Sequence, residues 1–236
     1  TLFVAPDDER YTSFEIPKRT GGMRTIDAPR PFLRKLQDAL LPVLQGAYRP
    51  HPSAHGFIPG RSVATNAALH AGRRHVLNID LQDFFPSVNF GRVRGLFMKP
   101  PFSCGPSAAT VLARVCTHRN GLPQGAPTSP VLSNFAAAEL DRRLTRLARG
   151  HRLTYSRYAD DITLSGEEGA FPPAVAFVAL DASGGRSVEA GQLLQREVTR
   201  AGFAIHPGKV RLQSRGTRQL VTGLVVNDKT NVTRGR

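Results

Sequence analysis

Cysteine is rare in this sequence of 236 residues: Cys104 and Cys116 are the only two, and they stand in no Cys-x-x-Cys or Cys/His spacing. A disulfide framework and a zinc site are therefore not expected, and reduced thiols in a cytoplasmic protein are the simpler interpretation. Long apolar runs are missing as well. No segment reaches membrane-spanning length and the first residues show no signal-peptide pattern, so we expect no membrane partner.

Acidic residues are few compared with basic ones: 18 Asp and Glu stand against 32 Lys and Arg, which gives a formal net charge of +14. Most of the positive charge is arginine, which pairs bidentately with phosphate and stacks on bases. The excess is spread along the chain rather than gathered in a tail. A broadly basic surface favours a polyanionic partner, with nucleic acid first, although a basic protein without such a partner would have the same composition.

The length permits one large domain or two joined lobes with a sizeable core. Near the start, the pattern predicts a hairpin with strands at Phe14–Ile16 and Met23–Ile26. A helix is predicted over Pro31–Tyr48, which Pro42 should kink or end. His75–Leu81 alternates as a strand with one apolar face.

The second half of the chain begins with a predicted helix over Ser129–Gly150. Its last turns carry several arginines, which suit the negative end of a helix at least as well as contact with nucleic acid: Arg142, Arg143, Arg146 and Arg149. Leu153–Ser165 is typical of two strands joined by a tight turn, and residues 166–191 of an insertion or mobile loop. A short helix ending at Gly202 follows, and then two strands, Val210–Ser214 and Gln219–Asn227. This mixture predicts an α+β fold with helices behind an antiparallel sheet.

Three carboxylates are the candidates for catalysis. Asp80 ends its strand, and Asp160 and Asp161 stand at the tip of the later hairpin. Adjacent acids repel each other unless a cation lies between them, and a third acid from a neighbouring strand would complete an oxygen-rich site for two Mg²⁺ ions, with Mn²⁺ as a substitute. Two such ions can activate an attacking hydroxyl and stabilise a leaving pyrophosphate. An Asp-Asp pair alone is weak evidence, because single acids in turns usually serve the turn.

Four separate segments, in the same order, resemble motifs of the reverse-transcriptase family. Asn78–Phe85 is similar to the first catalytic strand, and Gly121–Pro130 to the loop that lines the nucleotide pocket. Tyr158–Asp161 is similar to the signature turn, and His206–Lys209 to the motif that follows it. The resemblance runs from about Phe14 to Asn227.

This resemblance implies a right-hand polymerase of fingers and palm. The fingers would comprise residues 1–74, with part of the 86–125 region packing nearby. The palm would comprise residues 75–236, with the 166–191 insertion. The family continues with a helical thumb that holds the primer–template duplex, and we expect that thumb to be absent or truncated here.

The resemblance also implies roles for single residues. Asp80, Asp160 and Asp161 would hold the metal ions, together with the backbone carbonyl of Leu81. Phe85 falls where the family places an aromatic ring that excludes a ribose 2′-hydroxyl, although a plain core role is an alternative.

Further residues would bind the deoxynucleotide triphosphate. Gln124 and Gly125 would line its pocket, and Lys18 and Arg24 on the first hairpin would grip its phosphates. Arg19 competes with Lys18 for this role. Lys209 would protonate the departing pyrophosphate or form a structural ion pair.

Two short elements resemble those of retron reverse transcriptases: Asn66-Ala67-Ala68-Leu69-His70 and Val221-Thr222-Gly223. Asn66 and His70, with the Val-Thr-Gly triplet, would then take part in binding RNA, although at this spacing the first pair could simply cap and pack a helix. The implied partners are a structured non-coding RNA, which serves as template and primer, its DNA product, and an effector protein. The implied activity is copying of that RNA from an internal 2′-hydroxyl, in anti-phage defence. A group II intron or diversity-generating enzyme, or a non-catalytic RNA-binding relic, are the alternatives.

Overall fold

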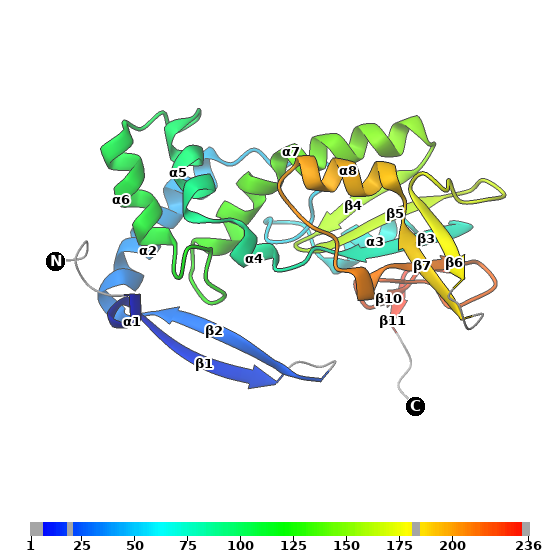
Figure 1. Ribbon diagram of the computed structural model, residues 1–236, viewed down its shortest axis with the longest axis horizontal. Coiled ribbons are helices and arrows are strands. Elements are labelled where there is room, and N and C mark those ends of the chain that lie inside the picture. Colours follow the sequence, from blue (N-terminus) through cyan, green and yellow to red (C-terminus); the bar gives the residue numbers. More distant parts are fainter. Residues whose placement is uncertain (1–6, 18–20, 181–184, 233–236) are drawn as a thin grey trace. The chain divides into compact units, whose positions relative to one another are not determined.

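The computed structural model describes residues 7–17, 21–180 and 185–232, and the chain divides into two compact units (Figure 1). The first unit comprises Thr1–Arg49 and Asp83–Ala136, and the second comprises Pro50–Gln82 and Ala137–Arg236. Residues 50–74, which we expected in the fingers, therefore cluster with the second unit. The reason is that the helix within them packs against strands of that unit. No described helix is long and apolar enough to cross a membrane.

In the first unit, α1 (Asp7–Arg10) leads into a hairpin of β1 (Tyr11–Pro17) and β2 (Met23–Pro29), with Phe14 opposite Ile26. The predicted hairpin is thus present, and its strands are longer than the sequence pattern indicated. Lys18 and Arg19 lie outside the described residues.

The helix α2 (Pro31–Ala47) continues through Pro42, so of the two effects expected of this proline, a kink or an end, the helix does not end there. Pro42 is exposed, whereas Leu33 and Leu44 are buried on the opposite stripe. Pro42 has no backbone N–H, so the helix lacks one hydrogen bond there. Burial of the apolar stripe offsets this loss and keeps the helix continuous.

The remaining helices of the first unit are α4 (Phe84–Ser87), α5 (Phe90–Met98) and α6 (Pro106–Cys116), and α5 packs against α6. The buried Gln37 joins α2 to this layer, because its Nε2 donates to the hydroxyl of Tyr11 at 3.0 Å and to the carbonyl oxygen of Val115 at 2.7 Å.

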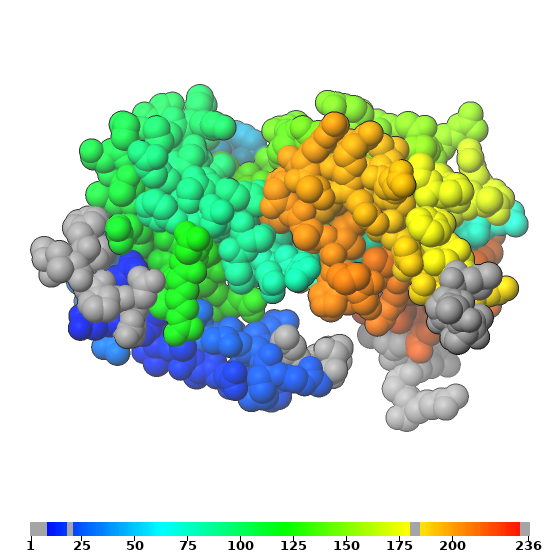
Figure 2. Space-filling model, in the orientation of Figure 1, coloured from blue at the N-terminus to red at the C-terminus, as the bar shows by residue number. Residues whose placement is uncertain are grey.

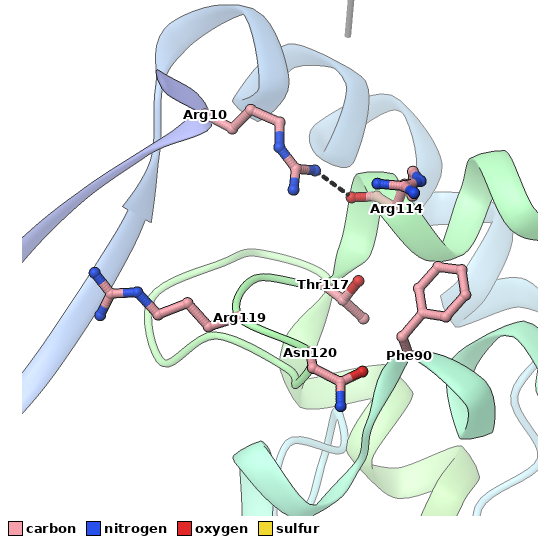
Figure 3. Close-up of a pocket in the computed structure, with 6 residues that line it drawn as sticks. All are labelled: Arg10, Phe90, Arg114, Thr117, Arg119 and Asn120. Carbon is pink, nitrogen blue, oxygen red and sulfur yellow. Dashed lines mark hydrogen bonds between the residues drawn. The ribbon is translucent and has the colours of Figure 1, made fainter. Parts of the chain in front are cut away.

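A small pocket of about 180 Å³ opens beside α6 (Figure 3). Arg10, which is only 8% exposed, donates from Nη1 to the carbonyl oxygen of Arg114 at 2.9 Å and so ties α1 to α6. The side chain of Arg119 points away from the other lining residues in Figure 3. Desolvation lowers the pKa of Arg10, and the nearby Arg114 lowers it further against the opposing effect of Tyr11.

The second unit is built on an antiparallel sheet in the order β4-β5-β3-β8. Its strands are β3 (His75–Asp80), β4 (Thr154–Tyr158), β5 (Asp161–Gly166) and β8 (Arg211–Ser214). The expected hairpin with a tight turn is therefore confirmed, and so is the alternation of antiparallel strands with helices.

Two helices lie on one side of this sheet (Figure 1): α7 (Ser129–Gly150), with its residues from Ala137 onward in this unit, and α8 (Gln192–Arg200). The apolar stripe of α7 repeats at helical spacing, and α8 presents its own stripe. The buried members are Leu140, Leu144, Leu147, Leu194 and Val198.

The predicted insertion at 166–191 is partly regular. It contains a hairpin of β6 (Ala176–Leu180) and β7 (Arg186–Ala190), which the expectation of an insertion or a mobile loop did not include. The burial of β7 follows no strict alternation, which is why the sequence pattern was weak there.

A second small sheet has the order β11-β10-β9, with β9 (Leu220–Val221), β10 (Leu224–Val225) and β11 (Asn231–Val232). The short helix α3 (Val63–Ala68) packs on it. Their shared apolar cluster contains Ala67, Val76, Val221 and Val226.

Candidate active site

The three candidate acids meet where β3 ends and β5 begins. Asp80 is the register partner of Asp161 across the two strands. Asp160 immediately precedes Asp161, and its carbonyl oxygen accepts the N–H of Leu81 at 3.1 Å. Residues 80 positions apart in sequence are thus neighbours because antiparallel pairing of β3 with β5 places both strand ends at one edge.

The electrostatics of this edge reflect crowded negative charge. The pKa of Asp161 is raised to about 6, mainly by burial and also by the charges of Asp160 and Asp80, while Lys209 opposes the shift. The Nζ of Lys209 lies 2.9 Å from Oδ1 of Asp80. An arrangement of this kind favours a cation, and in this structure an ammonium group supplies one.

Oxygen ligands of this type are those that Mg²⁺ prefers, so the donor set fits the expected metal. The side chains do not converge on one point, however. Within the described ranges, no three His, Cys, Asp or Glu side chains are grouped so as to hold a metal ion. Instead, the Nζ of Lys209 donates a hydrogen bond to Oδ1 of Asp80. The backbone therefore brings the acids together, while only the Asp80 carboxylate contacts the ammonium group of Lys209.

A buried ion pair holds the turn that carries Asp160. Arg157 donates from Nε and Nη2 to the two carboxylate oxygens of Asp141, at 2.8 Å each, and from Nη1 to the carbonyl oxygen of Ala159 at 3.0 Å. Neither charged side chain is exposed. The hydroxyl of Tyr155 also donates to Asp141, at 2.7 Å. Ala159 has a φ of 57°, a left-handed conformation that is costly without a glycine, and the Arg157 contact supports it.

The loop of residues 53–56, in the same unit, is hydrogen-bonded to the outer edge of β4. The N–H of Arg157 donates to Ser53 at 2.8 Å, and the N–H of His55 donates to the Arg157 carbonyl at 2.7 Å. Gly56 then passes so close to the turn that a Cβ on it would collide with the backbone nitrogen of Ala159. A larger residue at this position would displace the turn.

Sequence reasoning missed this support. The available signal was Asp141, a charged residue on the stripe of α7 that otherwise carries Ala137, Leu144 and Ala148. A carboxylate in such a stripe requires a partner, and only the fold reveals that the partner is Arg157.

Four of the expected nucleotide-binding residues, Arg24, Phe85, Gln124 and Gly125, lie in the first unit, whereas Lys209 belongs to the second. The carbonyl oxygen of Gln124 accepts the N–H of Asp27 on β2 at 2.8 Å. Gly125 has a φ of 130°, and a Cβ there would lie 2.9 Å from the Asp27 carbonyl oxygen. The glycine therefore permits a close approach of the loop to the hairpin, as its residue type suggested.

Phe85 is half-buried on α4, where its ring packs edge-on against Phe84 with centroids 5.6 Å apart. Its carbonyl oxygen accepts the N–H of Leu122 at 3.3 Å. Arg24 is exposed on β2, opposite Ile16. Phe85, the 121–125 loop and β2 are thus parts of one unit, and Lys18 lies outside the described residues.

The retron-like elements divide into a buried part and an exposed part. Asn66 and His70 are fully buried. The two ring nitrogens of His70 each lie 2.7 Å from a serine hydroxyl, of Ser165 and of Ser156. Burial lowers the pKa of His70 to about 3, with smaller contributions from Arg73 and His55. The expectation that Asn66 and His70 contact RNA conflicts with this burial, because neither side chain reaches the surface.

The Thr222–Gly223 turn is the accessible part. Val221 is buried beneath it, and Thr222 and Gly223 both have positive φ, of 47° and 84°. Such a turn suits a two-residue hairpin loop, although a β-branched residue in this conformation is strained. The hydroxyl of Thr222 donates to the carbonyl oxygen of Val63 at 3.3 Å, which ties the turn to α3.

Comparison with known proteins gives consistent results. Residues 16–220 match a family model described as "Reverse transcriptase (RNA-dependent DNA polymerase)". The Retron Mx65 reverse transcriptase of Myxococcus xanthus is 41% identical over 242 residues, covering 95% of this chain and 53% of that protein. The Retron Ec86 reverse transcriptase of Escherichia coli is 33% identical over 230 residues, covering 97% of this chain and 67% of that protein. The Retron Mx162 reverse transcriptase of M. xanthus is 39% identical and is covered over 47% of its length.

The fold also resembles solved structures at low sequence identity. An apo telomerase of Candida tropicalis, truncated from its C-terminal domain, gives a TM-score of 0.53 at 12% identity, covering 97% of this chain and 56% of that one. A telomerase of Candida albicans in complex with a fragment of telomeric RNA gives a TM-score of 0.59 at 10% identity, covering 93% and 45%. At such identity the likeness concerns the fold alone. The chain spans about half the length of the two Myxococcus relatives.

Proposed function

The chain belongs to the reverse-transcriptase family, and from this we propose that it forms the catalytic core of a retron-type RNA-directed DNA polymerase. The observation that carries the proposal is the pairing of Asp80 with Asp161, with Asp160 beside them. Unit one would serve as the fingers and unit two as the palm. Because the chain spans only part of its relatives, the activity of the whole protein is part of this proposal.

Members of the family generally use divalent metal ions. Here Asp80, Asp160 and Asp161, with the carbonyl oxygen of Leu81, would hold two Mg²⁺ ions, for which Mn²⁺ could substitute. When bound, these ions supply activation of the attacking hydroxyl and stabilisation of the pyrophosphate. The closeness of the three acids supports the proposal, because a cation between them would relieve their mutual repulsion.

Lys209 would have two roles in the proposed reaction, as the partner of Asp80 and as a proton donor. Its ammonium group neutralises Asp80 in the structure. Once another cation takes over that carboxylate, Lys209 would be available to donate a proton to the pyrophosphate. A purely structural ion pair is the alternative, and the two differ in the effect of Lys209→Arg, which keeps the charge but holds its proton more tightly.

Residues of the first unit would bind the deoxynucleotide triphosphate. Arg24, exposed on β2, would contact its phosphates, and Lys18 remains a candidate for the same role. Gln124 and Gly125 would line the pocket. The ring of Phe85 would exclude a ribose 2′-hydroxyl, so Phe85→Ala should raise incorporation of ribonucleotides relative to deoxynucleotides.

The decisive experiment measures metal-dependent incorporation of deoxynucleotides on an RNA template. We expect Asp160→Asn with Asp161→Asn to abolish incorporation, because two ligand charges are removed. The matched control is Glu167→Gln with Glu168→Gln, which removes two exposed carboxylates just beyond β5 and should leave the rate within about twofold, as surface substitutions usually do. Unchanged incorporation in the aspartate double variant would reject the assignment.

The retron-type activity needs a different test. The RNA would be a structured non-coding RNA that primes synthesis from an internal 2′-hydroxyl, and the exposed Thr222–Gly223 turn would contribute to its binding. The complete protein is co-expressed with its neighbouring locus, and DNA is examined for a 5′ end joined to an RNA 2′-oxygen. Branched products support this role, and any link to an effector protein and to defence would follow from it. Unbranched DNA alone would favour a group II intron or diversity-generating type of enzyme.

A further inference from the structure

A cleft of about 340 Å³ lies between the second half of α7 and α8. Figure 1 shows the two helices side by side, and Figure 2 shows the orange surface of α8 next to the yellow-green end of α7. Four arginines line the cleft, two from each helix: Arg143, Arg146, Arg196 and Arg200. The acids of the candidate active site are not among its lining residues.

Positive charge dominates this lining. Glu197 is the one acid among the residues that line the cleft, and its carboxylate is shared by three arginines at 3.1, 3.2 and 3.7 Å. Arg146 has no ion pair or hydrogen bond through its side chain in the described part of the chain. Arg143 also pairs with Glu139, which lies outside the lining. Two carboxylates cannot neutralise four guanidinium groups, so the cleft has a net positive field that an external anion would relieve.

The arginines form two short rows rather than one cluster. Arg143 and Arg146 are three residues apart on α7, and Arg196 and Arg200 are four residues apart on α8, which corresponds to about 4.5 Å and about 6 Å along the two axes. The side chains of Arg196 and Arg200 are 55% and 59% exposed. Two rows facing one groove suit a chain of successive anions better than a single small one, and guanidinium groups contact phosphate oxygens bidentately.

We propose that the α7–α8 cleft binds the phosphate backbone of structured RNA. The inference rests on the proposed function, since that function supplies the RNA, and it assigns a binding surface separate from the metal-binding turn. RNA helices are recognised mainly through their shape and through phosphate and 2′-hydroxyl contacts, for which a fixed basic groove is sufficient. Exposed arginines in rows can follow a phosphodiester strand without reading its sequence.

The test uses the 236-residue chain and a fluorescein-labelled 20-base-pair RNA hairpin of arbitrary sequence, with binding followed by fluorescence anisotropy at several salt concentrations. The variant is Arg146→Gln with Arg200→Gln. The control is Arg34→Gln with Lys35→Gln, which removes the same charge from an exposed part of α2. We expect the cleft variant to bind about tenfold more weakly and its salt slope to fall by about 2, since each phosphate contact contributes about 1. The control should change affinity less than twofold.

Three results would overturn the proposal. The first is an equal loss in both variants, which would mean that only the overall charge matters. The second is unchanged binding of both the RNA and a poly-glutamate peptide by the cleft variant. The third is unchanged RNA binding together with lost binding of a poly-glutamate peptide, which would assign the cleft to an acidic protein. Binding is measured in EDTA without nucleotides, so a negative result counts against the cleft and not against the polymerase. Thermal unfolding checks the fold, and Arg146→Lys with Arg200→Lys, which keeps the charge, should retain the salt slope while binding less tightly.

Discussion

Asp141 and Arg143 stand two residues apart on α7, and each belongs to an arginine–carboxylate pair. Asp141 and Arg157 are completely buried, whereas Arg143 is 26% exposed and its partners Glu139 and Glu197 are 43% and 14% exposed. A buried pair cannot exchange its partner for water, so it fixes geometry. An exposed pair is screened and exchangeable, so it can give way to a ligand. One helix thus carries a fixed support for the candidate active site and an adaptable basic surface.

The largest effect is expected from breaking the buried pair. Asp141→Ala leaves the Arg157 charge uncompensated in the interior and should lower the free energy of unfolding by about 3–5 kcal/mol. Urea unfolding measures this loss. A loss below about 1 kcal/mol would mean that the pair is not buried in solution as it is in the structure.

A second variant separates stability from positioning. Asp141→Leu with Arg157→Met replaces the pair by apolar side chains and should recover most of the lost stability. The carbonyl oxygen of Ala159 still loses its donor, so we expect the turnover rate to fall by about a hundredfold while the fold is kept. The KM for deoxynucleotides should change little. Full recovery of turnover would assign the pair a structural role only.

A smaller effect, and one that depends on pH, is expected at the buried but uncharged His70. Its folded pKa of about 3 lies below the ordinary value of 6.5, so the neutral form stabilises the fold and that stability is lost as pH falls below about 6.5. Between pH 6 and pH 4, wild type should lose about 1.4 kcal/mol per pH unit more than His70→Leu does. The measurement is chemical unfolding of both proteins across this range.

The stability of wild type and His70→Leu at neutral pH serves as a control for this pH dependence. At pH 7 the variant should be less stable by about 1–3 kcal/mol, because the hydroxyls of Ser156 and Ser165 lose their buried partner. Parallel pH profiles for the two proteins would show that His70 is solvated and titrates normally in the folded chain.

The smallest effect is expected at the exposed pairs. Glu139→Gln removes a carboxylate that contacts Arg142 and Arg143, both at 2.7 Å, yet it should change the free energy of unfolding by about 0.5 kcal/mol or less. The same substitution should strengthen RNA binding slightly at low salt, since it frees two arginines near the proposed cleft. A stability loss comparable with that of Asp141→Ala would remove the contrast between the two pairs.

The sequence alone predicted those parts of the fold that depend on patterns of contiguous residues. The strand ending at Asp80, the hairpin around Asp160 and the helix from Ser129 were predicted because their alternation and turn residues are contiguous. The pairing of Asp80 with Asp161 followed only from the family resemblance, since nothing local joins two positions so distant in the chain.

The misses have physical reasons of a different kind. Pro42 was tolerated because packing of the opposite face of α2 outweighs one lost hydrogen bond. Asn66 and His70 were expected to contact RNA, and the structure instead buries them, because the same spacing serves helix packing equally well. The ion pair between Arg157 and Asp141 forms because α7 and β4 pack against each other. The periodicity of the sequence does not predict which helix and strand will be in contact.

The contact between Lys209 and Asp80 has a consequence for the protein before it meets any substrate. The ammonium group of Lys209 neutralises part of the charge of the three acids. These residues should therefore reach their folded arrangement without magnesium in solution. The chain should therefore fold and survive purification in chelating buffers, in contrast to small metal-dependent domains that collapse when stripped. Under the proposed function, divalent ions would then bind together with the substrate rather than serve as part of the scaffold.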